Sequence, residues 1–389
     1  ACATFAAARN GRRAMRVLIW SQHLLGTGHL QRVGRIADAL AVRGHAVTVA
    51  NGGRAPEVAP RAWRRVDLKA IRAASAAFDG LVDDGGEPVG EALWARRRAA
   101  LAALVAEAPD VVVVEMFPFG RRAFARELVP FLEAWRGAPR RPHLVVSLRD
   151  VLVTKRKAGR DAEVVARLAR WFDRVLVHAD PRLVPLDASF PAARRIASWL
   201  RYTGYVAPEL AAPASRGEGV VVSAGGGVVG RALFDAALAA ARRLDGAVGP
   251  WTLVGGSALP DAEWARLEAR APADVRLLRA VDDLPALLAG ARVSVSQAGY
   301  NTVAEAMALR RPMVLVPFAR GDETEQTRRA EAVASMGAAR LISEAELDGA
   351  RLAAAVRDRA AASFPSLALD VDGARRSAEL LERVHEGRG

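Results

Sequence analysis

Residues 293–326 place glycine, amide, hydroxyl and carboxylate side chains next to two short apolar runs. Apolar runs predict a buried strand over Arg292 to Ser296 and a second one over Pro312 to Phe318, with a short helix from about Thr302 to Leu309 between them. A unit of this kind has parallel strands, and open α/β sheets bind ligands at the carboxyl ends of such strands. The stretch therefore predicts a ligand site formed by the turn before the helix and the loop after the second strand.

Both of these segments carry suitable groups. Gly299 permits a tight turn, and Asn301 and Thr302 stand at the predicted helix start, where unpaired amides favour a phosphate. Glu305 lies one turn further on, on the same helix face as Thr302. After the second strand come carboxylate and amide acceptors: Asp322, Glu323, Glu325 and Gln326. Phosphate donors facing hydroxyl-binding groups predict a nucleotide-sugar site. The alternative for Thr302 and Glu305 is a capping box, in which the pair only satisfies free helix amides.

The stretch resembles the donor-binding half of GT-B glycosyltransferases. It is most similar to the C-terminal domain of family 28, which includes the bacterial N-acetylglucosaminyltransferase of the lipid-linked peptidoglycan precursor. The A/S-G-x-x-T-x-x-E segment of that family matches residues 298–305. The resemblance extends to Gly337, and it implies that Glu305 holds the ribose of the nucleotide. It also implies that Glu325 and Gln326 hold hydroxyls of the donor sugar.

A second group of candidates lies in LLGTGH, residues 24–29, between a strand predicted over Arg16 to Trp20 and a helix. The dinucleotide fingerprint does not fit, because Gln31 replaces its last glycine and no acid ends the following strand. The segment resembles the glycine-rich first loop of GT-B enzymes, which implies a donor contact at Gly28. His29 is the first candidate for general base, with an acidic limb expected near its ordinary pKa of about 6.5. The alternative is a histidine that only shapes the loop.

Two carboxylates that end buried strands are the next candidates for the base. Glu115 ends VVVVE, and Asp150 follows the strand predicted over Leu144 to Leu148. For Asp150 the alternative is an ion pair within the fold. The segment MFPFGRR, residues 116–122, places aromatic side chains beside Glu115. They form either an apolar acceptor rim, which we favour, or a plug at the end of the sheet.

The second half of the chain also opens with a strand and a glycine loop, GVVVSAGGGVVG. Residues 225–230 match the dinucleotide pattern formally, but the next strand, WTLVGG, again ends without an acid. The resemblance implies that the glycine loop approaches the donor diphosphate and that a later loop meets the nucleobase. It assigns these further donor-binding positions: Ser223, Gly226, Gly227 and Val281.

Two glycine loops, one at the start of each half, predict an α/β protein of two Rossmann-like domains that face a cleft, the GT-B arrangement. Residues 207–219 are rich in Pro, Ala, Gly and charge, and they lack periodicity, so they are the predicted linker. We expect an acceptor domain over 15–206 and a donor domain over 220–370. The resemblance implies that the amphipathic helix within 371–389 crosses back onto the first domain.

Composition excludes several classes of site and partner. Half of the 389 residues are apolar and a quarter are charged, as in ordinary globular proteins. The single cysteine, Cys2, excludes a disulfide within the chain, a zinc cluster and a cysteine nucleophile. The six histidines include no H-x-x-x-H pair, and we expect neither a metal nor a cofactor other than the nucleotide-sugar co-substrate. Asp282 and Asp283 are interpreted as a helix N-cap rather than a metal site.

The net charge of +13 is accompanied by only three tyrosines and no basic-aromatic pattern, so no nucleic-acid partner is expected. A basic surface would favour an anionic donor or peripheral contact with an anionic membrane face. No apolar run reaches the length of a membrane span. Residues 1–14 are interpreted as an unstructured extension before Met15, and the expected location is cytoplasmic.

The predicted function is transfer of a sugar, with N-acetylhexosamine among the candidates, from a UDP-sugar to an acceptor hydroxyl or amine. Relatives of this fold usually invert the anomeric centre and need no metal. The acceptor stays open among a glycan, a lipid-linked molecule and a small molecule. The alternatives are a UDP-sugar hydrolase, a nucleotide-sugar epimerase and a non-catalytic nucleotide-sugar sensor.

Overall fold

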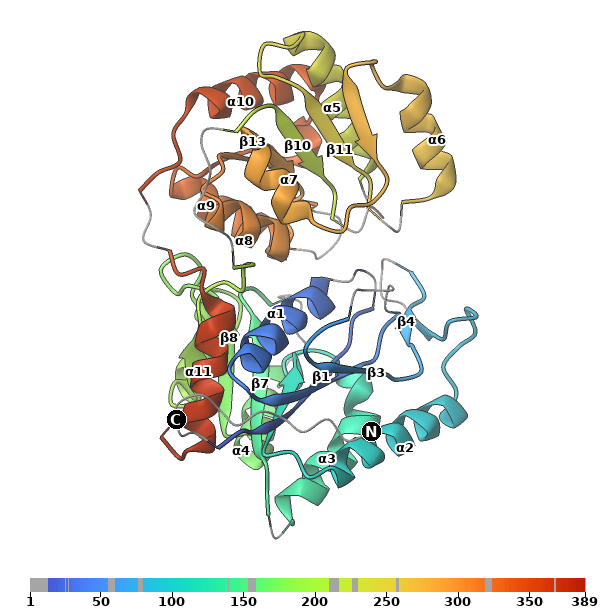
Figure 1. Ribbon diagram of the computed structural model, residues 1–389, viewed down its shortest axis with the longest axis vertical. Helices are drawn as coiled ribbons and strands as arrows, with labels where there is room; N and C mark the ends of the chain where they lie inside the picture. The colour runs from blue at the N-terminus through green and yellow to red at the C-terminus, as the bar shows by residue number, and fades with distance from the viewer. Residues whose placement is uncertain are drawn as a thin grey trace.

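Two parallel sheets, each flanked by helices, organise the chain into a lower and an upper domain (Figure 1). The computed structural model describes residues 13–388 except 25, 27, 55–59, 76–79, 139, 153–158, 210–216, 226–229, 257–258, 319–323 and 367–368. Some predictions fall outside these residues: the extension over 1–12, the central part of the 207–219 linker, Gly226, Gly227, Asp322 and Glu323.

The first domain is built on a sheet of seven parallel strands within the described residues, in the order β3-β2-β1-β6-β7-β8-β9. Its central strands are almost wholly apolar because helices cover both faces. The strands are β1 (Arg16–Ser21), β2 (Ala46–Asn51), β3 (Arg64–Asp67), β6 (Val111–Glu115), β7 (His143–Arg149), β8 (Arg174–His178) and β9 (Leu200–Tyr202). The flanking helices are α1 (Gly28–Val42), α2 (Glu91–Ala106), α3 (Ala125–Arg136) and α4 (Arg160–Trp171), and β4 (Arg72–Ala73) pairs with β5 (Leu81–Val82) apart from the sheet.

The second domain repeats this plan. Six parallel strands of the described chain form a sheet in the order β12-β11-β10-β13-β14-β15. They are β10 (Val220–Ser223), β11 (Trp251–Val254), β12 (Val275–Leu278), β13 (Val293–Ser296), β14 (Met313–Leu315) and β15 (Ala339–Leu341). The helices are α5 (Arg231–Leu244), α6 (Asp261–Arg270), α7 (Leu284–Gly290), α8 (Tyr300–Ala308), α9 (Glu325–Ser335) and α10 (Gly349–Ala361). The predicted α/β fold of two Rossmann-like domains is confirmed.

Each sheet has a point where the strand order reverses, between β1 and β6 in the first domain and between β10 and β13 in the second. The chain leaves the two central strands toward opposite sides of the sheet, so the loops that follow them diverge. In sheets of this type the ligand lies at that point, beyond the carboxyl ends of the strands. The residues after β1, β6, β10 and β13 are therefore the ones that lie at the expected ligand positions.

The last helix, α11 (Gly373–His385), packs against α1 and so returns to the first domain, as predicted (Figure 1). Its apolar face joins the core beneath α1 through Ala378, Leu381 and Val384. Arg43 donates two hydrogen bonds to Glu382, at 2.8 and 2.7 Å, and His45 lies 2.9 Å from the same carboxylate. Hydrogen bonding from Arg43 lowers the pKa of Glu382 to about 2.

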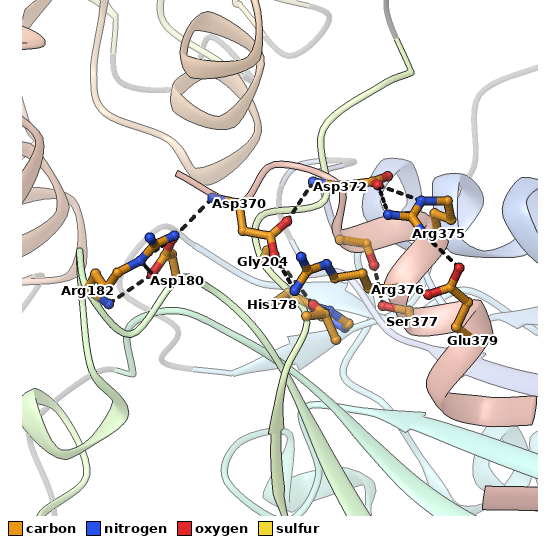
Figure 2. A network of polar contacts seen from close by, with 12 residues as sticks. His178, Asp180, Arg182, Gly204, Asp370, Asp372, Arg375, Arg376, Ser377 and Glu379 are labelled. Carbon is orange, nitrogen blue, oxygen red and sulfur yellow. Dashed lines mark hydrogen bonds and ion pairs between the residues drawn. The ribbon is translucent and has the colours of Figure 1, made fainter. Parts of the chain in front are cut away.

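The two segments that pass between the domains are tied to each other. Val206 forms an antiparallel bridge with Asp372, and the Tyr205 amide donates to the Asp370 carbonyl at 2.8 Å. Figure 2 shows the side-chain contacts around this crossing, in which the Asp370 amide donates to Asp180 at 3.1 Å and Arg376 pairs with Asp370 at 2.6 Å. These contacts hold the two crossing segments together at the boundary between the domains.

Gly204, beside Asp370 in Figure 2, is expected to tolerate no side chain. Its φ of +79° lies in the left-handed region, and a Cβ would approach the Asp370 carbonyl oxygen to 2.6 Å. Gly246 has a φ of +75° with no atom within 4 Å of a Cβ, so it is the matched control. Gly246→Ala should lower the free energy of unfolding by about 1–2 kcal/mol, the strain of the backbone alone. Gly204→Ala should lower it further in denaturant titrations, and equal losses would contradict the role given to Asp370.

Candidate functional site

The reversal point of the first sheet brings His29 and Glu115 into contact. His29 is the second residue of α1, which follows β1, and Glu115 is the last residue of β6. His29 Nδ1 lies 2.8 Å from Glu115 Oε1, and the Glu115 side chain is completely buried. Arg32 donates to the same carboxylate oxygen, and Ser21 Oγ donates to Oε2 at 3.0 Å. The carboxylate is thereby held against the imidazole from three directions.

The partners of His29 assign its tautomer. Arg121 Nη2 lies 3.1 Å from Nε2, and a guanidinium can only donate, so Nε2 is the accepting nitrogen. Nδ1 lies 2.8 Å from the Glu115 carboxylate, which can only accept, so Nδ1 carries the proton and donates it to Glu115. Arg32 Nη2 also lies 3.3 Å from Nδ1, but it donates to the same Glu115 oxygen. Nε2 is thus the nitrogen with the lone pair, which here accepts from Arg121, while a carboxylate holds the other side of the ring.

Burial of the imidazole, together with repulsion from Arg121 and Arg32 and against the attraction of Glu115, lowers the pKa of His29 to about 3. Burial alone would raise the pKa of Glu115, but His29 and Arg32 bring it below the ordinary range. The imidazole is therefore neutral throughout the usual pH range. The expectation of an acidic limb near pH 6.5 assumed a solvated histidine, and the lowered pKa moves the expected limb of the rate to lower pH.

In the second domain, α8 begins at Tyr300, two residues earlier than predicted, with Gly299 as its N-cap. Thr302 is thus inside the helix and makes no cap, so the capping-box alternative is wrong. Glu305 is buried, with 3% of its surface exposed, and its Oε1 accepts from Arg35 Nη2 of the first domain at 2.5 Å. Burial raises the pKa of Glu305 although Arg35 opposes the shift. Its Oε2 is buried without a hydrogen-bond partner in the described part of the chain, and it can accept from a ligand hydroxyl.

The starts of α1 and α8 meet across the boundary between the domains. Asn301 Nδ2 donates to the Gly28 carbonyl at 3.0 Å and to Gln31 Oε1 at 2.9 Å. The Arg32 guanidinium lies over the Tyr300 ring, 5.2 Å from its centroid. The predicted base and the predicted donor segment, about 270 residues apart in sequence, are therefore neighbours.

Asp150 and Glu325 share one arginine, Arg329, and these contacts join the two domains. Arg329, on α9, binds Asp150 through two nitrogens, at 2.6 and 2.7 Å, and both side chains are completely buried. The same guanidinium donates to Glu325 at 2.8 Å, and Arg149 pairs with the second oxygen of Glu325. Burial would raise the pKa of Asp150, but Arg329 lowers it more. The ion-pair alternative for Asp150 is confirmed, and this arrangement favours it over the catalytic role.

The remaining donor-binding candidates make hydrogen bonds or packing contacts within the second domain. Gln326 Oε1 accepts from the Phe318 amide at 3.0 Å, and Ser223 Oγ accepts from the Gly225 amide at 3.3 Å. Val281 is half-buried beside α7. Asp283 caps α7 by accepting from Ala286 at 2.9 Å, so the N-cap interpretation is confirmed for this residue.

Among the described residues, no group of three or more His, Cys, Asp and Glu side chains is placed to hold a metal ion. The helices of the same residues also include none with both the length and the apolar character that a bilayer crossing requires.

Three arginines of the site were not predicted from the sequence: Arg35, Arg121 and Arg329. Arg35 and Arg329 lie on helix faces whose orientation depends on the other domain. Arg121 belongs to MFPFGRR, where the prediction of an apolar rim is wrong, because Met116, Phe117 and Phe119 are buried in the core. Phe117 stacks on Trp171, and Phe119 meets Phe190 edge to face. The aromatics plug the sheet end, and the arginine after them reaches His29.

Residues 254–364 match the glycosyltransferase family 28 C-terminal domain. This match lies within the second domain and makes up less than a third of the chain. The matched range contains α8 with Asn301, Thr302 and Glu305, and it also contains Glu325 and Gln326 at the start of α9. The resemblance on which the donor residues were predicted is confirmed at the level of this domain.

Two curated relatives match parts of the chain. Both are named UDP-N-acetylglucosamine--N-acetylmuramyl-(pentapeptide) pyrophosphoryl-undecaprenol N-acetylglucosamine transferase. The protein from Solibacter usitatus is 41% identical over 69 residues, 18% of this chain and 19% of that protein. The one from Sinorhizobium fredii is 34% identical over 113 residues, 27% of this chain and 30% of that protein. The chain thus spans less than a third of the length of either relative.

Solved structures are similar over nearly the whole chain. The calicheamicin glycosyltransferase CalG4 has a TM-score of 0.57 at 20% identity, covering 97% of this chain and 96% of that one. MurG from Acinetobacter baumannii has a TM-score of 0.56 at 16% identity, covering 96% and 99%. The spinosyn rhamnosyltransferase SpnG, complexed with thymidine diphosphate, has a TM-score of 0.58 at 17% identity, covering 95% and 96%. These similarities confirm the GT-B fold.

Proposed function

We propose that this protein is a glycosyltransferase that moves a sugar from a UDP-sugar to a hydroxyl or amine of an acceptor. The observation that carries the proposal is the contact between the starts of α1 and α8, which sets the His29–Glu115 pair beside the family 28 donor segment. A base next to a nucleotide-sugar segment is the arrangement that glycosyl transfer needs.

The chemistry assigned to this geometry is a direct displacement with inversion. The acceptor oxygen or nitrogen attacks the anomeric carbon, its proton passes to His29 Nε2, and the bond to the diphosphate breaks with its electron pair leaving on UDP. Glu115 holds the Nδ1–H and stabilises the imidazolium that forms. The free amides at the start of α8 offset the negative charge that develops on the leaving diphosphate, so the proposal includes no metal.

Glu305→Ala should weaken UDP binding, because the carboxylate is assigned to the ribose hydroxyls. Its Oε2 has no hydrogen-bond partner among the described residues and can accept from one of these hydroxyls. A charged hydrogen bond of this kind contributes about 1.5–3 kcal/mol. Thymidine diphosphate, the ligand in the SpnG structure, lacks the 2′-hydroxyl, so the variant should lose less affinity for it than for UDP. Calorimetry with both nucleotides makes the comparison. Ala308→Ser, at the end of the same helix, controls for changes to α8, and unchanged UDP affinity in folded Glu305→Ala would reject the assignment.

Gln326→Ala should impair use of the UDP-sugar while UDP affinity stays nearly the same, because Gln326 is assigned to the sugar rather than to the nucleotide. Titrations with UDP and with UDP-N-acetylglucosamine in parallel measure the difference. Since Gln326 also accepts from the Phe318 amide, Gln326→Glu serves as the control that keeps an acceptor at that position. Equal losses for UDP and the UDP-sugar in the alanine variant would place the sugar elsewhere.

Product analysis tests the function itself and separates it from a hydrolase, an epimerase and a sensor. Incubation with a panel of UDP-sugars should give slow release of UDP without acceptor and fast release with one. Rapid release of free sugar without acceptor identifies a hydrolase, and a changed UDP-sugar identifies an epimerase. Binding without turnover identifies a sensor. A lipid-linked acceptor, by analogy with the curated relatives, would place the protein peripherally at the cytoplasmic membrane face, and vesicle co-sedimentation of the +13 chain tests that location.

A further inference from the structure

The proton-accepting nitrogen of His29 is already occupied. Arg121 Nη2 donates to Nε2 at 3.1 Å, and Nδ1 is held by Glu115. An acceptor hydroxyl cannot give its proton to Nε2 while the guanidinium uses the same lone pair. If His29 is the base proposed above, on which this inference rests, Arg121 must move before each turnover.

Arg121 is placed by a segment under backbone strain. It is a non-glycine residue with φ 54° and ψ 30°, in the left-handed region, immediately before the short 3₁₀ helix Arg122–Phe124. Its Nε donates to the Gln22 carbonyl at 2.8 Å, just beyond the end of β1. Strain of this kind persists where the surrounding structure imposes it, and it is concentrated at functional sites. The Arg121 side chain is thus held at Nε by the Gln22 carbonyl, and only its terminal nitrogen Nη2 contacts His29.

The charges around Arg121 show what would draw the guanidinium away from His29. Burial lowers its pKa to about 10; Glu115 and Glu325 oppose the shift, whereas Arg149 and Arg32 add to it. Both carboxylates already bind arginines, Glu115 to Arg32 and Glu325 to Arg149 and Arg329. Arg149 also keeps a buried Nε without a hydrogen-bond partner among the described residues. Neighbouring guanidiniums whose N–H groups are not all used favour binding of an oxyanion, because its oxygens can accept several N–H hydrogen bonds at once.

We propose that Arg121 blocks the base in the acceptor-free protein and that the acceptor releases it by presenting an oxyanion, a phosphate or a carboxylate, close to the attacking hydroxyl. The oxyanion binds between Arg121 and Arg149 and takes the Arg121 guanidinium from Nε2. The hydroxyl then occupies the position that Arg121 has left. Arg121 is a positioning and specificity-determining residue, because neutral acceptors leave the base blocked and water alone does not open it.

The reactivity of Nε2 tests this without an identified acceptor. Diethyl pyrocarbonate acylates neutral imidazole, and peptide mass spectrometry measures the rate at His29. The wild-type protein is treated at constant ionic strength with sodium chloride, with saturating UDP, and with saturating UDP plus either inorganic phosphate or acetate. Phosphate or acetate should accelerate acylation of His29 about tenfold or more, the factor that corresponds to losing one charge-assisted hydrogen bond. Comparing the two anions shows which oxyanion the site takes.

Variants on the same loop isolate Arg121. Arg121→Gln should be acylated fast in every condition, and Arg121→Lys, which keeps the charge, is the second variant if the glutamine protein is unfolded. Arg122→Gln, at the exposed neighbouring arginine, should behave like the wild type.

Acceleration by UDP alone, with no further effect of phosphate or acetate, overturns the proposal, because the anion would then be the donor diphosphate. Wild-type acylation that no anion changes also overturns it, and so does an Arg121→Gln rate equal to the wild type. These outcomes leave the glycosyltransferase proposal intact, since that proposal fails only if product analysis shows no transfer.

Discussion

Replacement of His29 with alanine is expected to reduce glycosyl transfer by about 10²–10⁴-fold while donor affinity changes little, because a positioned general base contributes that factor to turnover. Donor binding should survive because His29 contacts Glu115, Arg32 and Arg121 of its own domain. Single-turnover kinetics with donor in excess measure the chemical step directly.

Glu115→Gln should reproduce much of this loss, since an amide keeps the shape of the side chain but no longer stabilises the imidazolium. The control is His143, which begins β7 and therefore lies at the amino ends of the strands, away from the site at their carboxyl ends. His143→Ala should turn over like the wild type. A His29→Ala protein within a few-fold of the wild type would make His29 a residue that only shapes the loop.

The pH dependence follows from the lowered pKa of His29. A group with a folded pKa of about 3 binds its proton only in strong acid, so the base stays neutral and competent from neutral pH down to well below pH 5. The wild-type rate should therefore show no acidic limb near pH 6.5. Arg121→Gln removes a positive charge beside the ring, which raises the pKa of His29, and its rate should begin to fall at a higher pH than that of the wild type.

The sequence was sufficient to predict the residues at the ends of β1, β6 and β13, because strand composition and glycine turns are local signals. VVVVE predicted its strand with the observed bounds, and the reversal of strand order then places Glu115 beside His29. The same reasoning located Glu305, although it misplaced the start of α8 by two residues. That shift excludes the capping box for Thr302 and Glu305.

Contacts between the domains could not be predicted in this way. Arg329 and Asp150 are 179 residues apart, and Arg35 and Glu305 are 270 apart, so no local pattern relates them. The lowered pKa of His29 could not be predicted from the sequence either. It depends on burial and on two arginines that reach the ring from α1 and from the loop after β6. Sequence patterns specified which groups end strands, and tertiary packing determined which charges surround them.

Replacement of Arg329 with methionine is expected to destabilise the protein by about 3–5 kcal/mol, because it leaves Asp150 buried without its ion-pair partner. The loss should exceed that of any exposed residue on α9, and Glu331→Ala is the matched control on the same helix. Arg329 also donates to the Ala298 carbonyl at 2.7 Å, so the variant removes a hydrogen bond to the turn before α8 as well. Denaturant titrations at neutral pH give the free energies of unfolding.

The double variant Asp150→Asn with Arg329→Met distinguishes an unpaired charge from lost packing. If the buried charge is the cause, the double variant should be more stable than Arg329→Met alone. The pH dependence has a definite sign. In the wild type the lowered pKa of Asp150 stabilises the fold above the ordinary aspartate pKa of about 3.9, and this is lost as the pH falls through the lower folded value. In Arg329→Met burial alone raises the pKa of Asp150, so the variant should approach the wild type in stability as the pH falls. A difference that does not change with pH would mean that Arg329 acts through packing rather than through its charge.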